Sequence, residues 1–303
     1  PPPMRATLPL LAALVSPTVA LRRVVVTGGN KGIGQAICKR ILCDHPDTHV
    51  LLGSRSAARG EKAIQQILAD PAAPSDAADR IEVLPLETTD DASVAAAVKA
   101  VADKYGSEPA PLHGLCCNAG VGFGRSISET LSVNLYGVKR CCEAFLPLIE
   151  PDGGRIVNIA SASGPNFVRG LGGEQEELFT SPSTTWDELD AALTKYAALT
   201  DNDGISYGLS KAALTQYTMQ LARQQPTLKV NACSPGYVLT DLTAGMGASK
   251  TPDESTCHVA PLFLLLDDEV PTPPATAWYY GSDAVRSPLN VYRGPGDPPY
   301  KGD

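Results

Sequence analysis

Short apolar runs alternate with longer stretches of helical spacing along most of the chain. Residues 24–26 are three consecutive valines, as expected of a strand buried on both faces of a sheet. Further apolar runs predict strands at residues 49–53, 81–86, 112–117, 155–159 and 229–233. Helices are expected at residues 31–42, 57–68, 91–104, 133–149, 207–224 and 253–266. This alternation predicts an α/β fold, a doubly wound parallel sheet with helices on both faces.

The alternation breaks at about residues 165–206, where Gly, Glu and Thr are mixed and one helix is indicated at residues 186–198. Loops of this length are uncommon unless they are functional. A Pro-rich tail follows the last predicted helix. No linker separates two cores, so residues 21–303 are predicted to form one dinucleotide-binding catalytic domain with an insertion.

The first predicted strand ends in a glycine-rich turn, TGGNKGIG, at residues 27–34. Glycines allow backbone to bend sharply and to approach a ligand, and the N-terminus of the following helix offers free N–H groups to a phosphate. A tight turn without a ligand is the alternative. The candidate cofactor contacts in this turn are Gly28, Asn30, Lys31, Gly32, Ile33 and Gly34.

The second predicted strand is followed by Arg55, about 20 residues after the glycine turn, where dinucleotide sites meet the adenosine ribose. An acid there favours NAD, whereas a basic group accommodates the 2′-phosphate of NADP. Lys31 adds a second cation nearby. Unless both are solvated surface charges, the chain is predicted to use NADP(H).

Tyr207 and Lys211 are spaced so that a phenol and an ammonium share one face of a helix near its start. The ammonium and the positive helix end are expected to lower the pKa of the phenol from about 10. Such a phenol can give a proton to a carbonyl oxygen as hydride arrives, or accept one from an alcohol in reverse. An exposed Tyr/Lys pair without catalytic role is the alternative.

Two further polar residues add to this pair. Ser161 follows a predicted strand and can donate a hydrogen bond to the same oxygen, although an ordinary turn hydroxyl would look alike. Asn134, early in a predicted helix, would be unusual in a core unless its amide were satisfied, and it could hold a water beside Lys211. Asn134, Ser161, Tyr207 and Lys211 are therefore the candidate catalytic residues.

Over residues 22 to about 265, the chain resembles the short-chain dehydrogenase/reductase family. The motifs that carry the resemblance occur in the family's order: TGGNKGIG, NAG at 118–120, Asn134, Ser161, YxxxK and PGYVLTD at 235–241. The resemblance implies a Rossmann-type fold, catalysis by those four residues, and contact of the loop after Pro235-Gly236 with the nicotinamide. It adds these candidate cofactor contacts: Glu87, Asn118, Ala119, Gly120, Tyr207, Lys211, Pro235, Gly236, Val238 and Thr240.

Within the family, the chain looks most like the monomeric NADPH-dependent carbonyl reductases, on the wording GGNKGIG, SRSAARGEKAIQQI, YGLSK and PGYVLTDL. The insertion before Tyr207 is shared with them and covers the surface that other members use to oligomerise, which implies a monomer. Three departures concern Glu87 in place of the usual adenine-contacting Asp, Cys117 in place of Asn, and a shortened segment between Gly120 and Asn134. The last of these borders the substrate pocket, so substrate specificity stays open.

The charge and the cysteine content limit the classes of partner and ligand that the protein is expected to bind. A formal net charge of −8 argues against nucleic acid or an anionic membrane surface. The eight cysteines include two adjacent pairs and no CxxC or Cys/His cluster, which predicts free thiols and no metal. Residues 1–20, with Met4-Arg5 before an apolar run, are typical of a short targeting segment for an organelle; a disordered extension of a cytoplasmic protein is the alternative. The apolar run is too short to span a membrane.

The sequence thus predicts an NADPH-dependent oxidoreductase that reduces the carbonyl of a small aldehyde, ketone or quinone. Two alternatives stay open. One is an NADP-dependent alcohol dehydrogenase that works in the oxidative direction. The other is a nucleotide-binding regulatory protein without turnover, against which the complete set of four catalytic residues argues.

Overall fold

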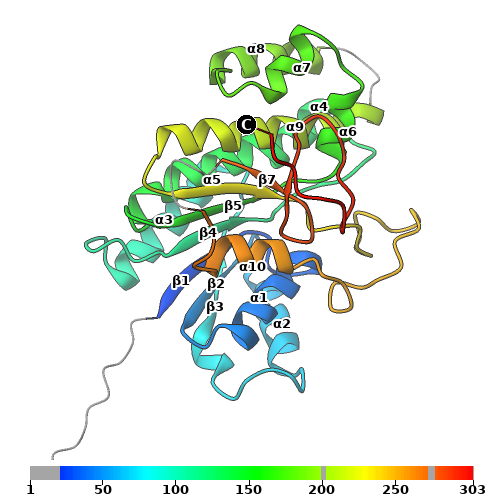
Figure 1. The fold of residues 1–303 in the computed structure, drawn as a ribbon. Helices are drawn as coiled ribbons and strands as arrows, with labels where there is room; N and C mark the ends of the chain where they lie inside the picture. Colours follow the sequence, from blue (N-terminus) through cyan, green and yellow to red (C-terminus); the bar gives the residue numbers. More distant parts are fainter. Residues whose placement is uncertain (1–20, 199–202, 272–276, 303) are drawn as a thin grey trace, which may run out of the picture.

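The computed structural model describes residues 21–198, 203–271 and 277–302. One sheet in the order β3-β2-β1-β4-β5-β6-β7-β8 runs through the molecule. Its strands are β1 Arg22–Val26, β2 Thr48–Ser54, β3 Ile81–Pro85, β4 Gly114–Cys117, β5 Arg155–Ile159, β6 Lys229–Cys233, β7 Tyr279–Tyr280 and β8 Arg286–Ser287. All neighbours pair in parallel except β7 and β8 (Figure 1). The doubly wound α/β fold predicted from the sequence is confirmed.

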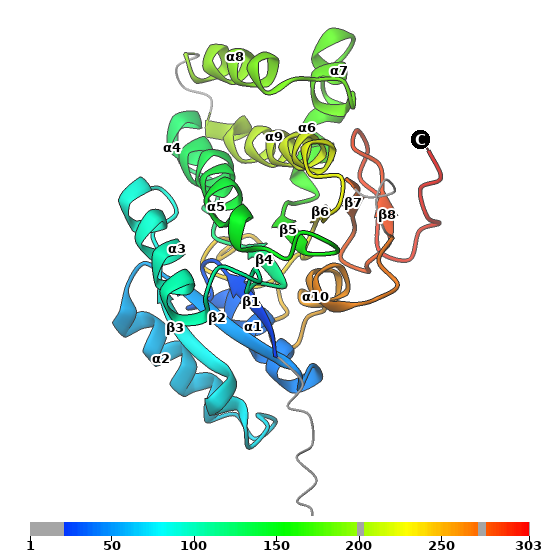
Figure 2. The same cartoon turned by 90° about the vertical axis from the view of Figure 1, so that its left-hand side faces the viewer.

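Alternate residues of each strand face opposite cores, because side chains in a strand point to opposite faces. Val25 packs with the apolar faces of α3 Asp91–Tyr105, α5 Gly137–Phe145 and α9 Asp203–Gln224. Val24 and Val26 pack with α1 Gly32–Asp44, α2 Ala57–Leu68 and α10 Val259–Leu266 (Figure 2). The sheet is therefore buried on both faces, as the continuous valine run indicated.

The helix predicted at residues 133–149 begins earlier and is interrupted. α4 Ile127–Leu131 starts at a capping box in which Ser126 and Glu129 satisfy each other's backbone amides. A π-helical turn, Ser132–Tyr136, follows, and α5 ends at Phe145, just before Pro147. Asn134 thus lies in the middle of a helical segment rather than near its start.

The insertion contains more helix than predicted. α6 Ser163–Arg169 and α7 Glu174–Thr180 accompany the expected helix, α8 Trp186–Ala197. Both α7 and α8 lie over α9 (Figures 1 and 2). α9 itself begins at Asp203, a turn earlier than predicted, so Tyr207 is not at the helix start.

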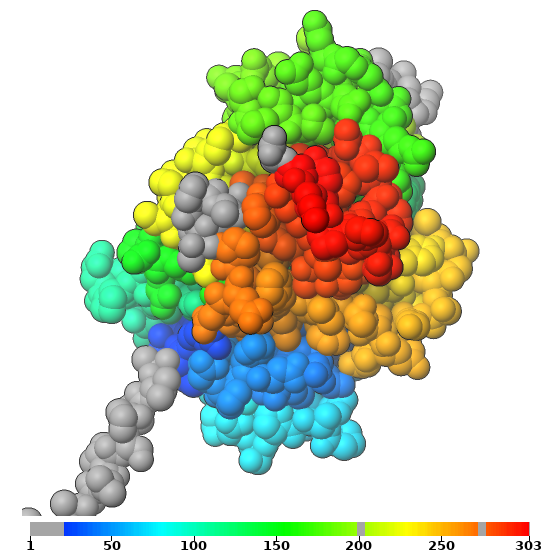
Figure 3. Space-filling view, in the orientation of Figure 1, coloured from blue at the N-terminus to red at the C-terminus, as the bar shows by residue number. Residues whose placement is uncertain are grey.

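The C-terminal part departs from its prediction in two ways. α10 begins at Val259 rather than at residue 253, since the intervening residues form turns. The tail adds β7 and β8, of two residues each, which are too short to show any periodicity in the sequence. Residues 277–302 form a continuous surface between the insertion and α10 (Figure 3).

One prediction concerns residues outside this description. The targeting segment predicted at residues 1–20 lies outside the described residues. Within the described residues, no helix is long and apolar enough to cross a membrane.

Candidate active site

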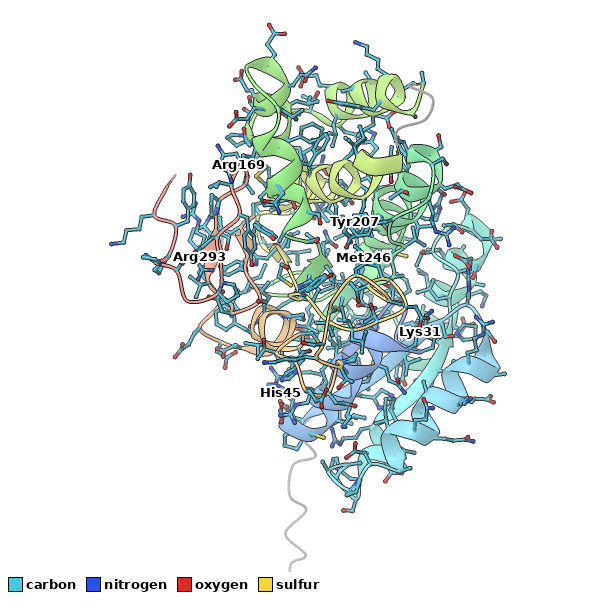
Figure 4. All side chains as sticks on the ribbon, turned by 90° about the vertical axis from the view of Figure 1, so that its right-hand side faces the viewer. Lys31, His45, Arg169, Tyr207, Met246 and Arg293 are labelled. Atoms are coloured by element: carbon cyan, nitrogen blue, oxygen red, sulfur yellow. The ribbon has the colours of Figure 1, made fainter. Side chains whose placement is uncertain are left out.

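The loops that follow β1, β4, β5 and β6 all leave the carboxyl edge of the sheet, where parallel sheets bind ligands. These loops carry the glycine turn, the NAG motif, Ser161 and the PGYVLTD motif. Arg55 and Glu87 follow β2 and β3, whereas Asn134, Tyr207 and Lys211 lie on helical segments. Figure 4 shows this side of the molecule, with Lys31, Tyr207 and Met246 labelled. β1 and β4 lie side by side in the sheet, and the chain winds outward from them in opposite directions. The carboxyl ends of β1 and β4 are therefore the switch point of the sheet.

The glycine turn between β1 and α1 depends on its missing Cβ atoms. Gly28 and Gly32 have φ values of +65° and +57°, which other residues rarely adopt. A Cβ on Gly34 would lie 2.4 Å from the Gly28 carbonyl oxygen and 2.4 Å from Asn118 Nδ2. The first turn of α1 holds no acid, so the positive end of its dipole faces the turn uncompensated.

Asn118 and Ala119 support this turn from the end of β4. Asn118 Nδ2 donates to the Thr27 and Gly28 carbonyl oxygens at 3.0 and 3.3 Å. The Ala119 amide donates to Thr27 Oγ1 at 3.0 Å. The side chain of Asn118 therefore holds the turn in shape, and Gly120 follows beside Asn134 and Lys211.

The ribose end brings Arg55 and Glu87 together. Arg55 Nη1 lies 3.7 Å from Glu87 Oε2, with the Arg55 side chain 69% exposed. The other oxygen of Glu87 accepts from the amide and hydroxyl of Thr89 at 3.2 and 3.0 Å. The carboxylate predicted to meet the adenine is thus folded back on its own loop and paired with the arginine.

Sequence analysis did not single out Asp241 as a partner of the glycine turn. Lys31 Nζ forms an ion pair with Asp241 Oδ2 at 2.5 Å, and this bond lowers the pKa of the Asp241 carboxyl. Thr240 lies beside Gly32, 3.5 Å from where a Cβ would stand. The loop after Pro235-Gly236 is therefore joined to the glycine turn, and Val238 packs with Ile33 beneath it.

The available signal in the sequence was that Asp241, the last residue of PGYVLTD, directly follows the predicted cofactor contact Thr240. Gly236 bends at a φ of +85°, against Ser282 of the C-terminal tail.

Tyr207 and Ser161 meet at the end of β5. Tyr207 is only 7% exposed, and burial raises the pKa of its phenol, with a smaller opposing effect from its hydrogen bond with Ser161. The lower pKa of Tyr207 that was predicted from Lys211 and the helix start is not found. The reason is that Tyr207 lies in the second turn of α9 and in an apolar setting, where desolvation disfavours the phenolate.

Lys211 lies on the same face of α9, with Nζ 5.7 Å from the centroid of the Tyr207 ring. Its ammonium donates to the Ile159 carbonyl oxygen at 2.7 Å. Burial lowers the pKa of Lys211 to about 8, close to neutral. Lys211 can therefore gain and lose a proton near physiological pH.

Asn134 contacts the loop after β4 rather than standing free. Its Oδ1 accepts from the Val121 amide at 2.8 Å, while Nδ2 donates to the Val121 carbonyl oxygen and to Ser210 Oγ. Both amide hydrogens are thus used by protein, and one lone pair of Oδ1 is left for a water. The π-helical turn holds this side chain toward Gly120.

Phe123 is a site residue that the sequence analysis missed. Its ring lies 4.6 Å from the Tyr207 ring, and it is 44% exposed. Gly122 beside it leaves room for Leu242, whose Cγ would lie 2.5 Å from a Cβ at that position. An aromatic residue three positions after the NAG motif was the available signal. The shortened segment therefore places an aromatic ring against Tyr207.

Thiols and metal ligands are distributed without any centre. All eight cysteines are free, and Cys117 Sγ lies 3.8 Å from Cys142 Sγ. Among the described residues, no group of three His, Cys, Asp or Glu side chains could hold a metal ion.

A dinucleotide-type glycine turn near a buried Tyr and Lys and a half-buried Ser, at the switch point of the sheet, defines an oxidoreductase site of the short-chain type. A family profile described as short chain dehydrogenase matches residues 22–172. NADPH carbonyl reductase 1 of Macaca fascicularis is 32% identical over 274 residues, covering 83% of this chain and 94% of that protein. NADPH carbonyl reductase 3 of Rattus norvegicus is 30% identical, with 81% and 91% covered. The chain belongs to the short-chain dehydrogenase family.

Solved structures agree on the fold. Salutaridine reductase from Papaver somniferum matches with a TM-score of 0.70 and 25% identity, covering 86% of this chain and 99% of that one. The NADPH-bound carbonyl reductase from chicken fatty liver matches with a TM-score of 0.61 and 21% identity, covering 88% and 99%. The resemblance inferred from the motifs is thereby confirmed.

Proposed function

We propose that this protein uses NADPH to reduce the carbonyl group of a small aldehyde, ketone or quinone to an alcohol. The observation that carries the proposal is the buried Tyr207 phenol beside Ser161, with Lys211 behind it, at the switch point of the sheet. The relatives named NADPH carbonyl reductase support both the reaction and the cofactor.

The residues present fit NADP(H). The glycine turn and the N-terminus of α1 would take the pyrophosphate, because the backbone there can approach closely and the dipole end is positive. Arg55 would take the 2′-phosphate with its exposed guanidinium. When bound, the dihydronicotinamide supplies the hydride. The remaining predicted contacts would lie along the bound cofactor, among them Asn30, Ile33, Pro235 and Val238.

The chain's own residues would handle the proton. As the carbonyl carbon receives hydride, negative charge develops on its oxygen, and Tyr207 donates its hydroxyl proton there. Ser161 holds that oxygen by a hydrogen bond. A raised pKa keeps Tyr207 protonated at neutral pH, which is the form that reduction requires. Lys211, with its pKa near 8, would return a proton to the phenolate, and a water on Asn134 would link Lys211 to solvent.

The protonated state of Tyr207 also bears on the oxidative alternative. An alcohol dehydrogenase needs the phenolate to accept a proton, and burial disfavours that form. A regulatory protein without turnover would need none of Tyr207, Ser161 and Lys211 as a set. The relatives named as NADPH reductases support reduction as the working direction.

NADPH oxidation against aldehydes, ketones and quinones tests this function. We expect turnover with NADPH, and Tyr207→Phe should lower kcat by about 100-fold or more because it removes the proton donor and keeps the ring. NADPH binding should be unchanged. Tyr105→Phe, beside His49 and Glu82 at the opposite edge of the sheet, is the matched control and should keep full activity. Substantial activity in Tyr207→Phe would assign the proton to another group.

We also propose that the protein is a monomer, because α7 and α8 cover the outer face of α9. Sedimentation equilibrium tests this, and a stable dimer would contradict it.

A further inference from the structure

An aromatic ring that belongs to none of the sequence motifs lies against the candidate catalytic phenol. Phe123 is 44% exposed, whereas Tyr207 is only 7% exposed. The two ring centroids are 4.6 Å apart, and the ring planes are inclined at 48°. Because one ring of this pair is exposed and the other is buried, the Phe123 ring takes up surface of Tyr207 that water would otherwise reach.

The chain fixes the place of this ring from one side. Val121, two residues earlier, accepts from and donates to the Asn134 amide at 3.0 and 2.8 Å. A Cβ on Gly122 would lie 2.5 Å from Leu242 Cγ, so the backbone there is packed closely against the loop after β6. Gly124 follows with a φ of +75°, and nothing among the described residues lies within 4 Å of its Cβ position. The segment is therefore anchored immediately before Phe123 and packed against nothing immediately after it.

The polar surroundings of Tyr207 leave water as the main influence on its proton. Within the described residues, Lys211 of α9 has Nζ 5.7 Å from the ring centroid, and Ser161, after β5, hydrogen-bonds with the phenol. Tyr279 of β7 is a second phenol nearby; burial raises its pKa, and Tyr207 adds a smaller effect in the same direction. Residues 120–124 carry no titratable side chain. Desolvation is the largest influence on the pKa of Tyr207, and it raises that pKa.

We propose that Phe123 is a positioning residue for the reaction: its ring keeps water from the Tyr207 phenol and leaves the hydroxyl to the substrate carbonyl. The role in the reaction rests on the reductase function proposed above. The shielding itself belongs to the folded chain and can be measured without turnover.

Loss of the ring has a consequence of known sign. Water that reaches the phenol stabilises the phenolate, so the pKa of Tyr207 falls toward its ordinary value near 10. Reduction requires the protonated phenol, and its rate should therefore decline at a lower pH than in the wild type. Lys211 titrates in both proteins and does not account for a difference between them.

The first test measures access to the phenol with N-acetylimidazole, a reagent that acetylates tyrosines that solvent reaches. Full-length protein is treated at pH 7.5, and acetylation of each tyrosine is followed by peptide mass spectrometry. Tyr207 should be acetylated at least about tenfold faster in Phe123→Ala than in the wild type. Tyr237, which is 58% exposed, and Tyr217, which is 3% exposed, give the two ends of the scale in the same digest.

The second test is the pH dependence of kcat/KM for NADPH-dependent reduction, from initial rates between pH 7 and 10.5. The alkaline midpoint should lie at least about 0.5 pH unit lower in Phe123→Ala than in the wild type. Phe123→Leu keeps an apolar cover of similar reach, so it should restore both the midpoint and the slow acetylation. Phe123→Ser also removes the ring, and it serves if the alanine variant fails to fold.

Tyr300→Ala is the matched control, since it removes an exposed ring that contacts Arg286 of the tail rather than Tyr207. It should behave as the wild type does in both tests. Equal acetylation of Tyr207 with and without the Phe123 ring, or an unmoved alkaline midpoint, would overturn the proposal. Absence of turnover in the wild type would overturn the proposed function instead, and the acetylation rates would still decide whether Phe123 shields the phenol.

Discussion

At the scale of single residues, burial decides how the catalytic groups titrate. Tyr207 and Lys211 are both almost without solvent, and desolvation pushes each toward its neutral form. The phenol stays protonated, and the ammonium loses its proton more readily. Sequence spacing predicted that the two residues share a helix face. It could not predict the direction of the tyrosine shift, because that depends on what surrounds the side chain.

Arg55 gives a prediction at this scale. Arg55→Asp should shift the preference from NADPH toward NADH by at least about tenfold in kcat/KM, because it replaces the donor to the 2′-phosphate by a repelling carboxylate. Steady-state kinetics with both cofactors measure this ratio. Arg169→Asp, exposed at the end of α6 and far from Lys31 in Figure 4, makes the same charge change elsewhere and should leave the ratio unaltered. An unchanged ratio in Arg55→Asp would assign the 2′-phosphate to other residues.

At the scale of elements, the loops after the strands hold one another. Asn118 fastens the end of β4 to the glycine turn, Lys31 fastens that turn to Asp241, and Asn134 fastens α4 and its π turn to Val121. The site is thus supported by hydrogen bonds between segments that are far apart in the sequence. Small shifts in one loop reach the others through these bonds.

Gly34→Ala tests this coupling. Alanine favours a helix by about 1 kcal/mol over glycine, so local propensity alone predicts stabilisation. The added Cβ would instead meet the Gly28 carbonyl oxygen and Asn118 Nδ2 at 2.4 Å. We therefore expect a loss of about 1–3 kcal/mol in urea unfolding and weaker NADPH binding by fluorescence titration.

Gly172→Ala is the matched control for that variant, since nothing lies within 4 Å of its Cβ position. It should bind NADPH as the wild type does. A Gly34→Ala protein that is more stable and binds NADPH normally would show that the turn and α1 can move apart freely.

At the scale of the whole molecule, seven of the eight cysteines are buried as free thiols. Burial raises the pKa of five cysteines in the core, to about 12 for Cys116 and Cys141, and in the same direction for Cys38, Cys233 and Cys257. The pKa of Cys117 is also raised, by its hydrogen bond with Cys142 and then by burial. A folded pKa above the unfolded one contributes stability that is complete below the unfolded pKa. That stability is lost as the pH rises toward the folded pKa.

The predicted consequence is a steep alkaline loss of stability. Above about pH 9 each buried thiol should remove up to about 1.4 kcal/mol of unfolding free energy per pH unit. Lys211 opposes this with one group, because its pKa is lowered in the folded state. Urea unfolding with a reducing agent at pH 8, 9 and 10 measures the slope, and Cys38→Ala should make it shallower. A flat profile over this interval would mean that the thiols ionise in the folded protein.

The sequence by itself determined the fold class and the family, and it predicted the residues of the candidate site. The valine run, the glycine turn and the YxxxK spacing are local patterns whose geometry follows from strand, turn and helix periods. Ser126 and Glu129 have the spacing of a capping box and mark the start of α4 in the sequence, a signal that the helix predicted at residues 133–149 does not include. Residues 21–303 as one catalytic domain and the catalytic roles of the four candidates stay predictions for the experiments above.

Only the tertiary structure decided which of these residues meet. The pairing of Arg55 with Glu87, the Lys31–Asp241 bond and the aromatic contact of Phe123 with Tyr207 all join separate segments. The two short strands β7 and β8 exist through pairing at the sheet edge rather than through any pattern of their own. Contacts of this kind, and the burial that sets the titration of Tyr207 and Lys211, depend on packing in three dimensions, which no local period of the sequence encodes.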